Sequence, residues 1–361
     1  MRNFTFAIFL CFFDFVSEIV MRTLLGLIFL TAMVGAYRGL RFAVRTHAPM
    51  RHTALSAMLD DMAAINAEML AVREDQILGK QTGGVSAMTK VPLATASSKA
   101  TAVGRLLELD GCLSVQSVLT PDTSSQLLEY ILEENKNCED RCDAGFPPEL
   151  LFGGVNCRGD RKKKYGQRRD LFLSMKNSVV KNSLGEALEN LRPVLHKVVG
   201  EQAMIHEVSS IISYPGSPRQ CVHADTIVLP CPQYPNASME PLYTVFIALQ
   251  DVEEGMGHTV FIPKTHTAAA HGLWNACEKS ETNKIKFLAG QNVSQSQLKV
   301  GDCSIFDSRI LHCGRENKSE KTRVLFYFTI SRQHSWPLPN GLHGSNSMRQ
   351  EDRWIYTLDK L

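Results

Sequence analysis

The second half of the chain carries short apolar runs of the length and composition that form β-strands. Residues 243–250 (YTVFIALQ) and 323–330 (RVLFYFTI) are rich in β-branched and aromatic side chains, and residues 304–312 (SIFDSRILH) form a third, largely apolar run. Polar, turn-forming residues at 315–320 separate the last two runs. The pattern predicts buried strands, and the single turn predicts that the strands on either side of it are neighbours.

Two helices are predicted before these strands. Pro121 marks the start of the first, and a second is predicted over Leu184–Val199. The buried face of the first helix is expected to carry Leu127, Leu128, Ile131 and Leu132. Helices that flank a β-rich region predict an α+β, β-dominated fold, a double-stranded β-helix (jelly roll, cupin-like) with flanking helices.

The N-terminus has a different hydrophobic pattern. Residues 4–20 are apolar but interrupted by Asp14 and Glu18, and after a basic residue a continuous apolar run extends to Ala36. A positive start, an apolar middle and a small-residue end are typical of a secretory signal. They predict entry into the secretory pathway (endoplasmic reticulum or Golgi lumen, or secretion) with cleavage near Ala36. The alternative is an uncleaved anchor that associates the protein with a membrane, since the two runs together exceed the length that spans a bilayer.

The next segment, residues 37–58, is rich in arginine and has no acidic residue before Asp60. Arginine-rich, acid-poor segments are typical of transit peptides. A signal followed by such a segment resembles the two-part plastid address of algae with complex plastids. The alternative is a basic flank that orients a membrane anchor.

Composition then predicts where the segments and domains of the chain begin and end. Apolar residues at near-helical spacing predict an amphipathic helix over 55–73, and the residues at 79–100, rich in Gly, Ser, Thr and Ala, predict a linker. The predicted parts are a signal sequence or anchor at 1–36, a transit-like and helical segment with a linker at 37–105, a catalytic domain at 106–335 and a C-terminal tail at 336–361.

Charge and cysteine content limit the classes of function. The formal net charge of +2 argues against a dedicated nucleic-acid binder, and the sequence has no glycine-rich phosphate loop. Some of the ten cysteines could pair in an oxidising lumen, but the pairing is left open by the sequence. A basic run from Arg158 to Arg169 predicts a solvated loop. Its alternative is a mobile lid that recruits an anionic substrate such as a CoA thioester, a phosphate ester or an acidic lipid.

The candidate chemistry lies in a His-x-Asp motif, His223 and Asp225, and in a distant histidine, His312. Side chains at i and i+2 of a strand point the same way, so the motif can reach one metal ion. Two imidazoles and one carboxylate hold Fe(II) on one face and leave the other face open for a co-substrate and O₂. We expect Arg323 on the strand next to that of His312, where its guanidinium suits the far carboxylate of a dicarboxylic 2-oxo acid. Four other histidines are expected to be structural or surface residues and not ligands, namely His206, His258, His266 and His271.

Four segments, in their order and spacing, carry a family resemblance: Asp110–Leu113, Pro215–Asp225, Gly257–His266 and His312–Arg323. With them, the chain from about Leu109 to about Arg332 resembles the phytanoyl-CoA dioxygenase family of Fe(II)/2-oxoglutarate oxygenases.

The resemblance implies a set of site residues and cofactors. The iron ligands it implies are His223, Asp225 and His312. It also implies that Arg323 binds the distal carboxylate of 2-oxoglutarate, and it places Gln220 and Thr259 at further co-substrate contacts. Fe(II) would be the cofactor, 2-oxoglutarate and O₂ the co-substrates, succinate and CO₂ the products, and ascorbate a candidate auxiliary reductant.

Two positions bear on how far the family pattern extends. Lys264 stands where the family usually has Gly in a Pro-Gly-Ser-His turn, so the geometry of this turn is an open point. Asp225 is retained, whereas halogenating relatives replace this carboxylate by a small residue to admit chloride. The sequence therefore favours hydroxylation or a related oxidation.

The leading interpretation is an Fe(II)- and 2-oxoglutarate-dependent dioxygenase that hydroxylates a small-molecule or lipid-like substrate. The alternatives are a lumenal peptide or protein hydroxylase and a non-catalytic jelly-roll binding protein. The sequence does not identify the substrate, because pocket residues come from variable loops that set specificity independently of the metal site.

Overall fold

The protein is described by a computed structural model, which covers residues 86–155, 165–231, 241–277, 280–331 and 358. All of them belong to the second of two compact units, Ala64–Leu361. The predicted signal or anchor, the transit-like segment and the helix at 55–73 lie outside the described residues. Within these ranges, no helix has the length and apolar character needed to cross a bilayer.

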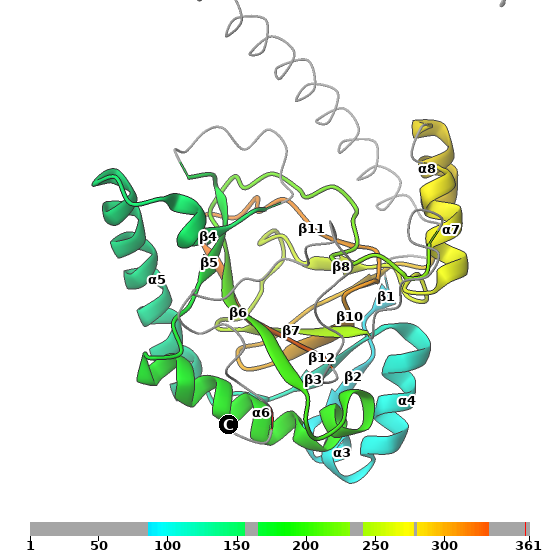
Figure 1. The fold of residues 1–361 in the computed structure, drawn as a ribbon, viewed down its shortest axis with the longest axis horizontal. Helices are drawn as coiled ribbons and strands as arrows, with labels where there is room; N and C mark the ends of the chain where they lie inside the picture. The colour runs from blue at the N-terminus through cyan, green and yellow to red at the C-terminus, as the bar shows by residue number, and fades with distance from the viewer. Residues whose placement is uncertain (1–85, 156–164, 232–240, 278–279, 332–357, 359–361) are drawn as a thin grey trace, which may run out of the picture. The chain divides into compact units, whose positions relative to one another are not determined.

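Two sheets form the framework of this unit (Figure 1). The larger sheet contains, in spatial order, β2 (Lys90–Pro92), β3 (Cys112–Gln116), β10 (Cys303–Asp307), β7 (Leu242–Ala248), β12 (Arg323–Ser331), β6 (Met204–Ser213), β5 (Arg168–Phe172) and β4 (Phe152–Gly153). The smaller sheet contains β1 (Ser86–Ala87), β9 (Ser294–Gln295), β8 (Thr259–Phe261) and β11 (His312–Gly314). Together they confirm the predicted jelly roll.

Alternation along the strands gives the larger sheet two different faces. On β12, Phe326 and Phe328 belong to the main hydrophobic core. The side chains of Arg323, Leu325 and Tyr327 alternate with these and line a cavity on the opposite face. One face of the larger sheet therefore buries apolar side chains against helices, and the other face is free to carry chemistry.

The main helices cover the apolar face. They are α3 (Leu93–Ser98), α4 (Ala100–Asp110), α5 (Pro121–Asp143) and α6 (Ser178–Val199), and α6 packs against the other three (Figure 1). The smaller sheet packs against α7 (Ala268–Ala276) and α8 (Glu281–Ala289) through Trp274 and Leu288. A single 3-10 turn, η1, occupies Pro148–Leu150.

The start of α5 shows why the helix prediction succeeded. Thr120 precedes the helix and its side chain accepts a hydrogen bond from the Thr123 amide, while Pro121 occupies the first turn. Leu127 and Ile131 are fully buried as predicted, but Leu132 is 40% exposed. The buried stripe of α5 is narrower than predicted, because charged residues occupy most of its outer surface.

Two predictions about the arrangement were wrong. Residues 79–100 were predicted to be a linker, yet from Ser86 onward they form β1, β2 and α3, and Val91 and Ala96 are buried in the core. The folded part therefore begins before the predicted domain start at 106. In addition, no two of the eight cysteines within the described ranges are joined to each other by a disulfide.

The second wrong prediction is that the strand of Arg323 lies next to the strand that supplies His312. The 304–312 run forms β10 in the larger sheet, turns at Ser308 and Arg309, and enters the smaller sheet as β11. β12 consequently pairs with β6 and β7, and not with the strand that carries His312. Arg323 and His312 lie on opposite sheets.

Candidate metal centre

The backbone brings His223 beside His312. The His223 amide donates to the His312 carbonyl at 3.0 Å, and the His312 amide donates back to the His223 carbonyl at 2.8 Å. His223 is in this isolated bridge and Asp225 is in a bend, so the predicted regular strand is absent here. Asp225 is instead fixed by its amide, which donates to the Ser308 carbonyl at 2.9 Å.

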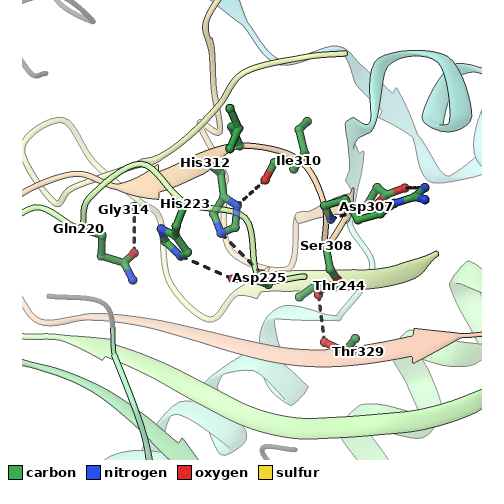
Figure 2. A network of polar contacts seen from close by, with 12 residues as sticks. Gln220, His223, Asp225, Thr244, Asp307, Ser308, Ile310, His312, Gly314 and Thr329 are labelled. Atoms are coloured by element: carbon green, nitrogen blue, oxygen red, sulfur yellow. Dashed lines mark hydrogen bonds and ion pairs between the residues drawn. The ribbon is translucent and has the colours of Figure 1, made fainter. Parts of the chain in front are cut away.

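The three side chains converge on one point (Figure 2). The Nε2 atom of His223 lies 3.5 Å from Oδ1 of Asp225, and the Nε2 atom of His312 lies 3.7 Å from Oδ2. All three ligand atoms lie within 4.8 Å of one another, and within the described ranges this is the only such group of His, Cys, Asp and Glu side chains. The sequence prediction that these residues meet is therefore matched by the geometry.

Backbone carbonyls orient both imidazoles. Nδ1 of His223 donates to the Cys221 carbonyl at 2.7 Å, and Nδ1 of His312 donates to the Ile310 carbonyl at 3.0 Å. A proton fixed on Nδ1 leaves the lone pair on Nε2, which is the atom that faces Asp225. Two Nε2 lone pairs and one carboxylate are the donor set that suits Fe(II) with open positions.

Burial and charge set the protonation of the group. Burial lowers the pKa of His312, and the Asp225 charge offsets only part of that shift. For His223, burial acts in the same direction, but the hydrogen bond and charge of Asp225 outweigh it and raise the pKa. Burial opposes ionisation of Asp225, yet the two histidines prevail and lower its pKa. The site thus favours an ionised carboxylate at Asp225.

Arg323 reaches the same cavity from the opposite sheet. The cavity has a volume of about 510 Å³ and is lined by the three candidate ligands, Arg323, Gln220 and Thr259, among others. The guanidinium is buried and donates to the Gly257 carbonyl and, at 3.1 Å, to Oγ of Ser213. A fixed guanidinium on the wall of a cavity that also holds a metal-type site suits a co-substrate with a carboxylate at its far end.

Gln220 and Thr259 flank Gly314, two residues after His312. Oε1 of Gln220 accepts a hydrogen bond from the Gly314 amide at 2.9 Å, and Thr259 faces Gly314 across the β8–β11 pair. A Cβ atom on Gly314 would lie 2.6 Å from Oε1 of Gln220 and 2.3 Å from Nη1 of Arg168. Only glycine allows these side chains to approach the backbone so closely.

The last two arginines of the basic run, Arg168 and Arg169, fit neither the predicted solvated loop nor its alternative, a mobile lid. Arg168 and Arg169 are neither solvated nor part of a lid, because both are buried in β5. Arg168 donates to the Pro218 and Arg315 carbonyls, and Arg169 contacts Asn135 on α5. Residues 158–164 lie outside the described ranges.

The four histidines that were expected to be structural form hydrogen bonds away from the candidate metal centre. Their ring nitrogens bond to Oγ of Ser331 and to the carbonyls of Ser296, Glu108 and Arg309, for His206, His258, His266 and His271 respectively. Lys264 adopts the left-handed conformation that glycine favours, with φ of +68°, so this position has a backbone shape that suits the glycine usual in the family better than a lysine.

Polar residues on the inner face of the larger sheet were missed from the sequence. Asp170, Glu207, Thr244 and Tyr327 also line the cavity. The signal was available in β6, where Glu207, Ser209 and Ser213 alternate with apolar residues on a strand that otherwise appears buried. Such polar alternation on a central strand indicates a lined cavity.

The sequence model of the phytanoyl-CoA dioxygenase family matches residues 107–325. The chain belongs to this family. The predicted family is confirmed, and with it the enzyme class, a 2-oxoglutarate-dependent dioxygenase that uses Fe(II) and 2-oxoglutarate. Among curated proteins, none matches the sequence.

Solved structures with a similar fold include further 2-oxoglutarate enzymes. The non-heme α-ketoglutarate-dependent carbocyclase SnoK from nogalamycin biosynthesis is 15% identical, with a TM-score of 0.48 over 69% of this chain and 87% of its own. HygX from Streptomyces hygroscopicus, with nickel and 2-oxoglutarate bound, is 13% identical, with a TM-score of 0.45 over 64% of this chain and 88% of its own. Similarities this low carry no inference about the substrate of the present family member.

Proposed function

We propose that His223, Asp225 and His312 hold the Fe(II) ion of this dioxygenase and that Arg323 binds the distal carboxylate of 2-oxoglutarate. The observation that carries the proposal is the convergence of two Nε2 atoms and one carboxylate within 4.8 Å, in a cavity whose opposite wall holds a buried arginine. Three separate segments contribute to this arrangement. His312 lies on β11 of the smaller sheet, the segment with His223 and Asp225 is bridged to β11, and Arg323 lies on β12 of the larger sheet.

The protein's own part in the chemistry is positioning. The carbonyls of Cys221 and Ile310 hold the two imidazoles in the ligating tautomer, and the Ser308 carbonyl holds the backbone at Asp225. The rings of Phe261 and Phe306 lie 5.8 and 5.1 Å from the His312 ring and exclude water from one side of the site. Bound iron and 2-oxoglutarate supply the oxidising power, with succinate and CO₂ as by-products.

We propose hydroxylation, or a related C–H oxidation, as the reaction on the substrate. Asp225 supports this choice, because a halogenase would need its position for chloride. A cavity of about 510 Å³ supports a small molecule over a protein segment as the substrate. The lumenal peptide hydroxylase and the lipid-like substrate are the alternatives that a substrate screen would distinguish.

The test is an anaerobic titration of the purified protein with Fe(II) and 2-oxoglutarate, monitored by the weak visible charge-transfer band of the chelate. Asp225→Ala should abolish the band. Arg323→Ala should require at least about tenfold more 2-oxoglutarate, since a charge-assisted hydrogen bond is lost. Asp140→Ala and Arg105→Ala, at exposed positions of α5 and α4, are the matched controls and should behave as the wild type.

Absence of the band in folded wild-type protein would overturn the site assignment and favour the second candidate, a non-catalytic jelly-roll binding protein. A band that survives Asp225→Ala would show that a different carboxylate completes the site.

A further inference from the structure

Four side chains form one row across the cavity face of the larger sheet. Thr329 of β12 pairs in register with Glu207 of β6 on one side and with Thr244 of β7 on the other. Side chains directly opposite each other on adjacent strands share a face, and Glu207 and Thr244 both line the cavity. From Thr244 the row continues to Ser308, the residue that follows the end of β10. Three hydroxyl groups and one carboxylate are thereby brought into contact.

The hydrogen bonds of this row run in one direction. The Thr329 hydroxyl donates to Oε2 of Glu207. Its only hydrogen is used there, so Thr244 donates in the 3.0 Å contact between the two threonines. The Thr244 hydrogen is then used in turn, so Ser308 donates to Thr244, also at 3.0 Å. The row therefore begins at Ser308 and ends at the carboxylate, and Figure 2 shows its part from Ser308 to Thr329.

Ser308 also holds the backbone of the segment that carries a proposed metal ligand. Its carbonyl accepts from the amides of Asp225, at 2.9 Å, and Thr226, at 3.0 Å. Its own amide donates to the Leu242 carbonyl at 2.8 Å. Asp225 lies in a bend, so a strand ladder does not fix its position. The place of its carboxylate therefore depends on where Ser308 is held.

Burial makes the row a defined link between the sheet and this segment. The side chains of Ser308, Thr244 and Thr329 are all buried, with at most 3% of each residue exposed. A buried hydroxyl that loses its partner bears the full cost of desolvation, so the arrangement in which every member is bonded is favoured. Because the Ser308 hydrogen is used on Thr244, it does not compete with a metal ion for the Asp225 carboxylate.

We propose that Thr244 and Thr329 are positioning residues for the iron ligand Asp225, on which they act through Ser308. The inference rests on the proposed function, because it concerns the same metal site. It gives β7 and β12 of the larger sheet a part in how iron is held.

The test removes one hydroxyl and measures the Fe(II) affinity of the full chain by competition with a chelator. Thr244→Val replaces the hydroxyl by a methyl group and leaves Ser308 without its acceptor, so Fe(II) should bind about tenfold more weakly. Thr244→Ser keeps the hydroxyl and should bind Fe(II) as the wild type does. In the iron-saturated Thr244→Val protein, the charge-transfer band should need no more 2-oxoglutarate than in the wild type, because Arg323 is unchanged.

Thr329→Val interrupts the row one residue further from the metal site, and it carries the test if Thr244→Val does not fold. It leaves Thr244 without its acceptor, so Fe(II) binding should weaken by about three- to tenfold. Both variants break the same row. The double variant should therefore bind Fe(II) no more weakly than Thr244→Val alone.

Ser114→Ala is the matched control. Ser114 lies on β3 of the same sheet, is 1% exposed, and donates to the Cys303 carbonyl at 2.8 Å. The variant removes a buried hydroxyl bond outside the row. It should lower the unfolding temperature and leave the Fe(II) affinity as in the wild type.

Wild-type Fe(II) affinity in Thr244→Val or in Thr329→Val would overturn the proposal. An equal loss of affinity in Ser114→Ala, a loss that Thr244→Ser shares, or effects that add in the double variant would also overturn it. Failure of the proposed function is recognised separately, because the wild-type protein would then lack the charge-transfer band with Fe(II) and 2-oxoglutarate.

Discussion

Gly314 lies at a position beside the proposed metal site where no side chain fits. Its amide donates to Oε1 of Gln220, and Nη1 of Arg168 lies at the place a side chain would occupy. The residue lies two positions after His312, so any shift of its backbone moves β11 and the proposed metal ligand with it. Its lack of a side chain is a requirement of the site and not of a turn.

Gly314→Ala should therefore impair co-substrate binding as well as folding. The added methyl group overlaps Arg168 and Gln220, and overpacking of this kind costs about 1–3 kcal/mol of unfolding free energy. We expect an increase of about tenfold in the 2-oxoglutarate needed for the chelate band, measured by titration, with stability measured by urea denaturation.

The control is Gly185→Ala on α6, where an added methyl group contacts nothing within 4 Å. Alanine in a helix is about 1 kcal/mol more favourable than glycine, so this variant should be at least as stable as the wild type. Wild-type stability and 2-oxoglutarate binding in Gly314→Ala would contradict the steric argument.

At the scale of elements, β5 shows how one strand serves the core and the site at once. Arg169 points to the helices and contacts Asn135 and Glu139 of α5. Arg168 points the other way and donates to the carbonyl groups of Pro218, at 3.2 Å, and Arg315, at 2.7 Å. These two carbonyls belong to the segments that carry the proposed ligands, so Arg168 ties both segments to the larger sheet.

Arg168→Lys should loosen the metal site without unfolding the protein. A lysine has one ammonium in place of a planar fork and does not span both carbonyls in the same way. Residues that orient metal ligands typically affect affinity by about 10–100-fold, so we expect weaker Fe(II) binding of that order, measured by competition with a chelator.

Arg169→Lys is the matched control for this test. It makes the same change one residue along, on the helix-facing side, and should lower the unfolding temperature with Fe(II) affinity as in the wild type. Equal effects of the two variants on Fe(II) affinity would mean that Arg168 acts only through general stability.

The elements also explain what the sequence predicted well and what it did not. The buried strands and the helix at Pro121 were predicted because local patterns and caps determine them. The short strands β1 and β2 were missed because their partners, β9 and β3, are contributed by other parts of the chain and leave no local signal. The strand that carries Arg323 was misplaced because a turn of ordinary length cannot reveal that the chain has crossed between sheets.

Only some residues of the candidate site could be identified from the sequence. His223, Asp225, His312 and Arg323 were found because a short motif and a family resemblance identify them. The carboxylates of Asp170 and Glu207 were not, because their meaning depends on which face of a strand they occupy. That face is decided by the packing of the whole sheet.

At the scale of the whole molecule, burial of ionisable groups makes stability depend on pH. His206 is buried in β6, and its ring bonds to Oγ of Ser331 on β12 at 2.6 Å. Burial lowers its pKa to about 4 from an ordinary value of 6.5. Between these pH values the unfolded chain binds a proton at His206 that the folded protein does not. The contribution of His206 to the free energy of unfolding is therefore fully present above pH 6.5 and is lost as the pH falls toward 4.

His206→Gln should remove this part of the pH dependence. We expect the loss of unfolding free energy between pH 7.5 and pH 4.5 to be about 2–3 kcal/mol smaller in the variant than in the wild type, by urea denaturation with a chelator present. Comparison of the two proteins cancels the contribution of all other titrating groups. Parallel pH profiles would contradict the burial of a neutral His206.

The division of the cavity between two sheets has an evolutionary consequence. The proposed iron ligands belong to β11 and the segment bridged to it, whereas the opposite wall of the cavity is lined by residues of β5, β6, β7 and β12. Substitutions in one sheet can change what is oxidised while the other sheet preserves how iron is held. Selection can therefore act on specificity and on reactivity as nearly separate traits, which gives a family built on this plan a short mutational route from one substrate to the next.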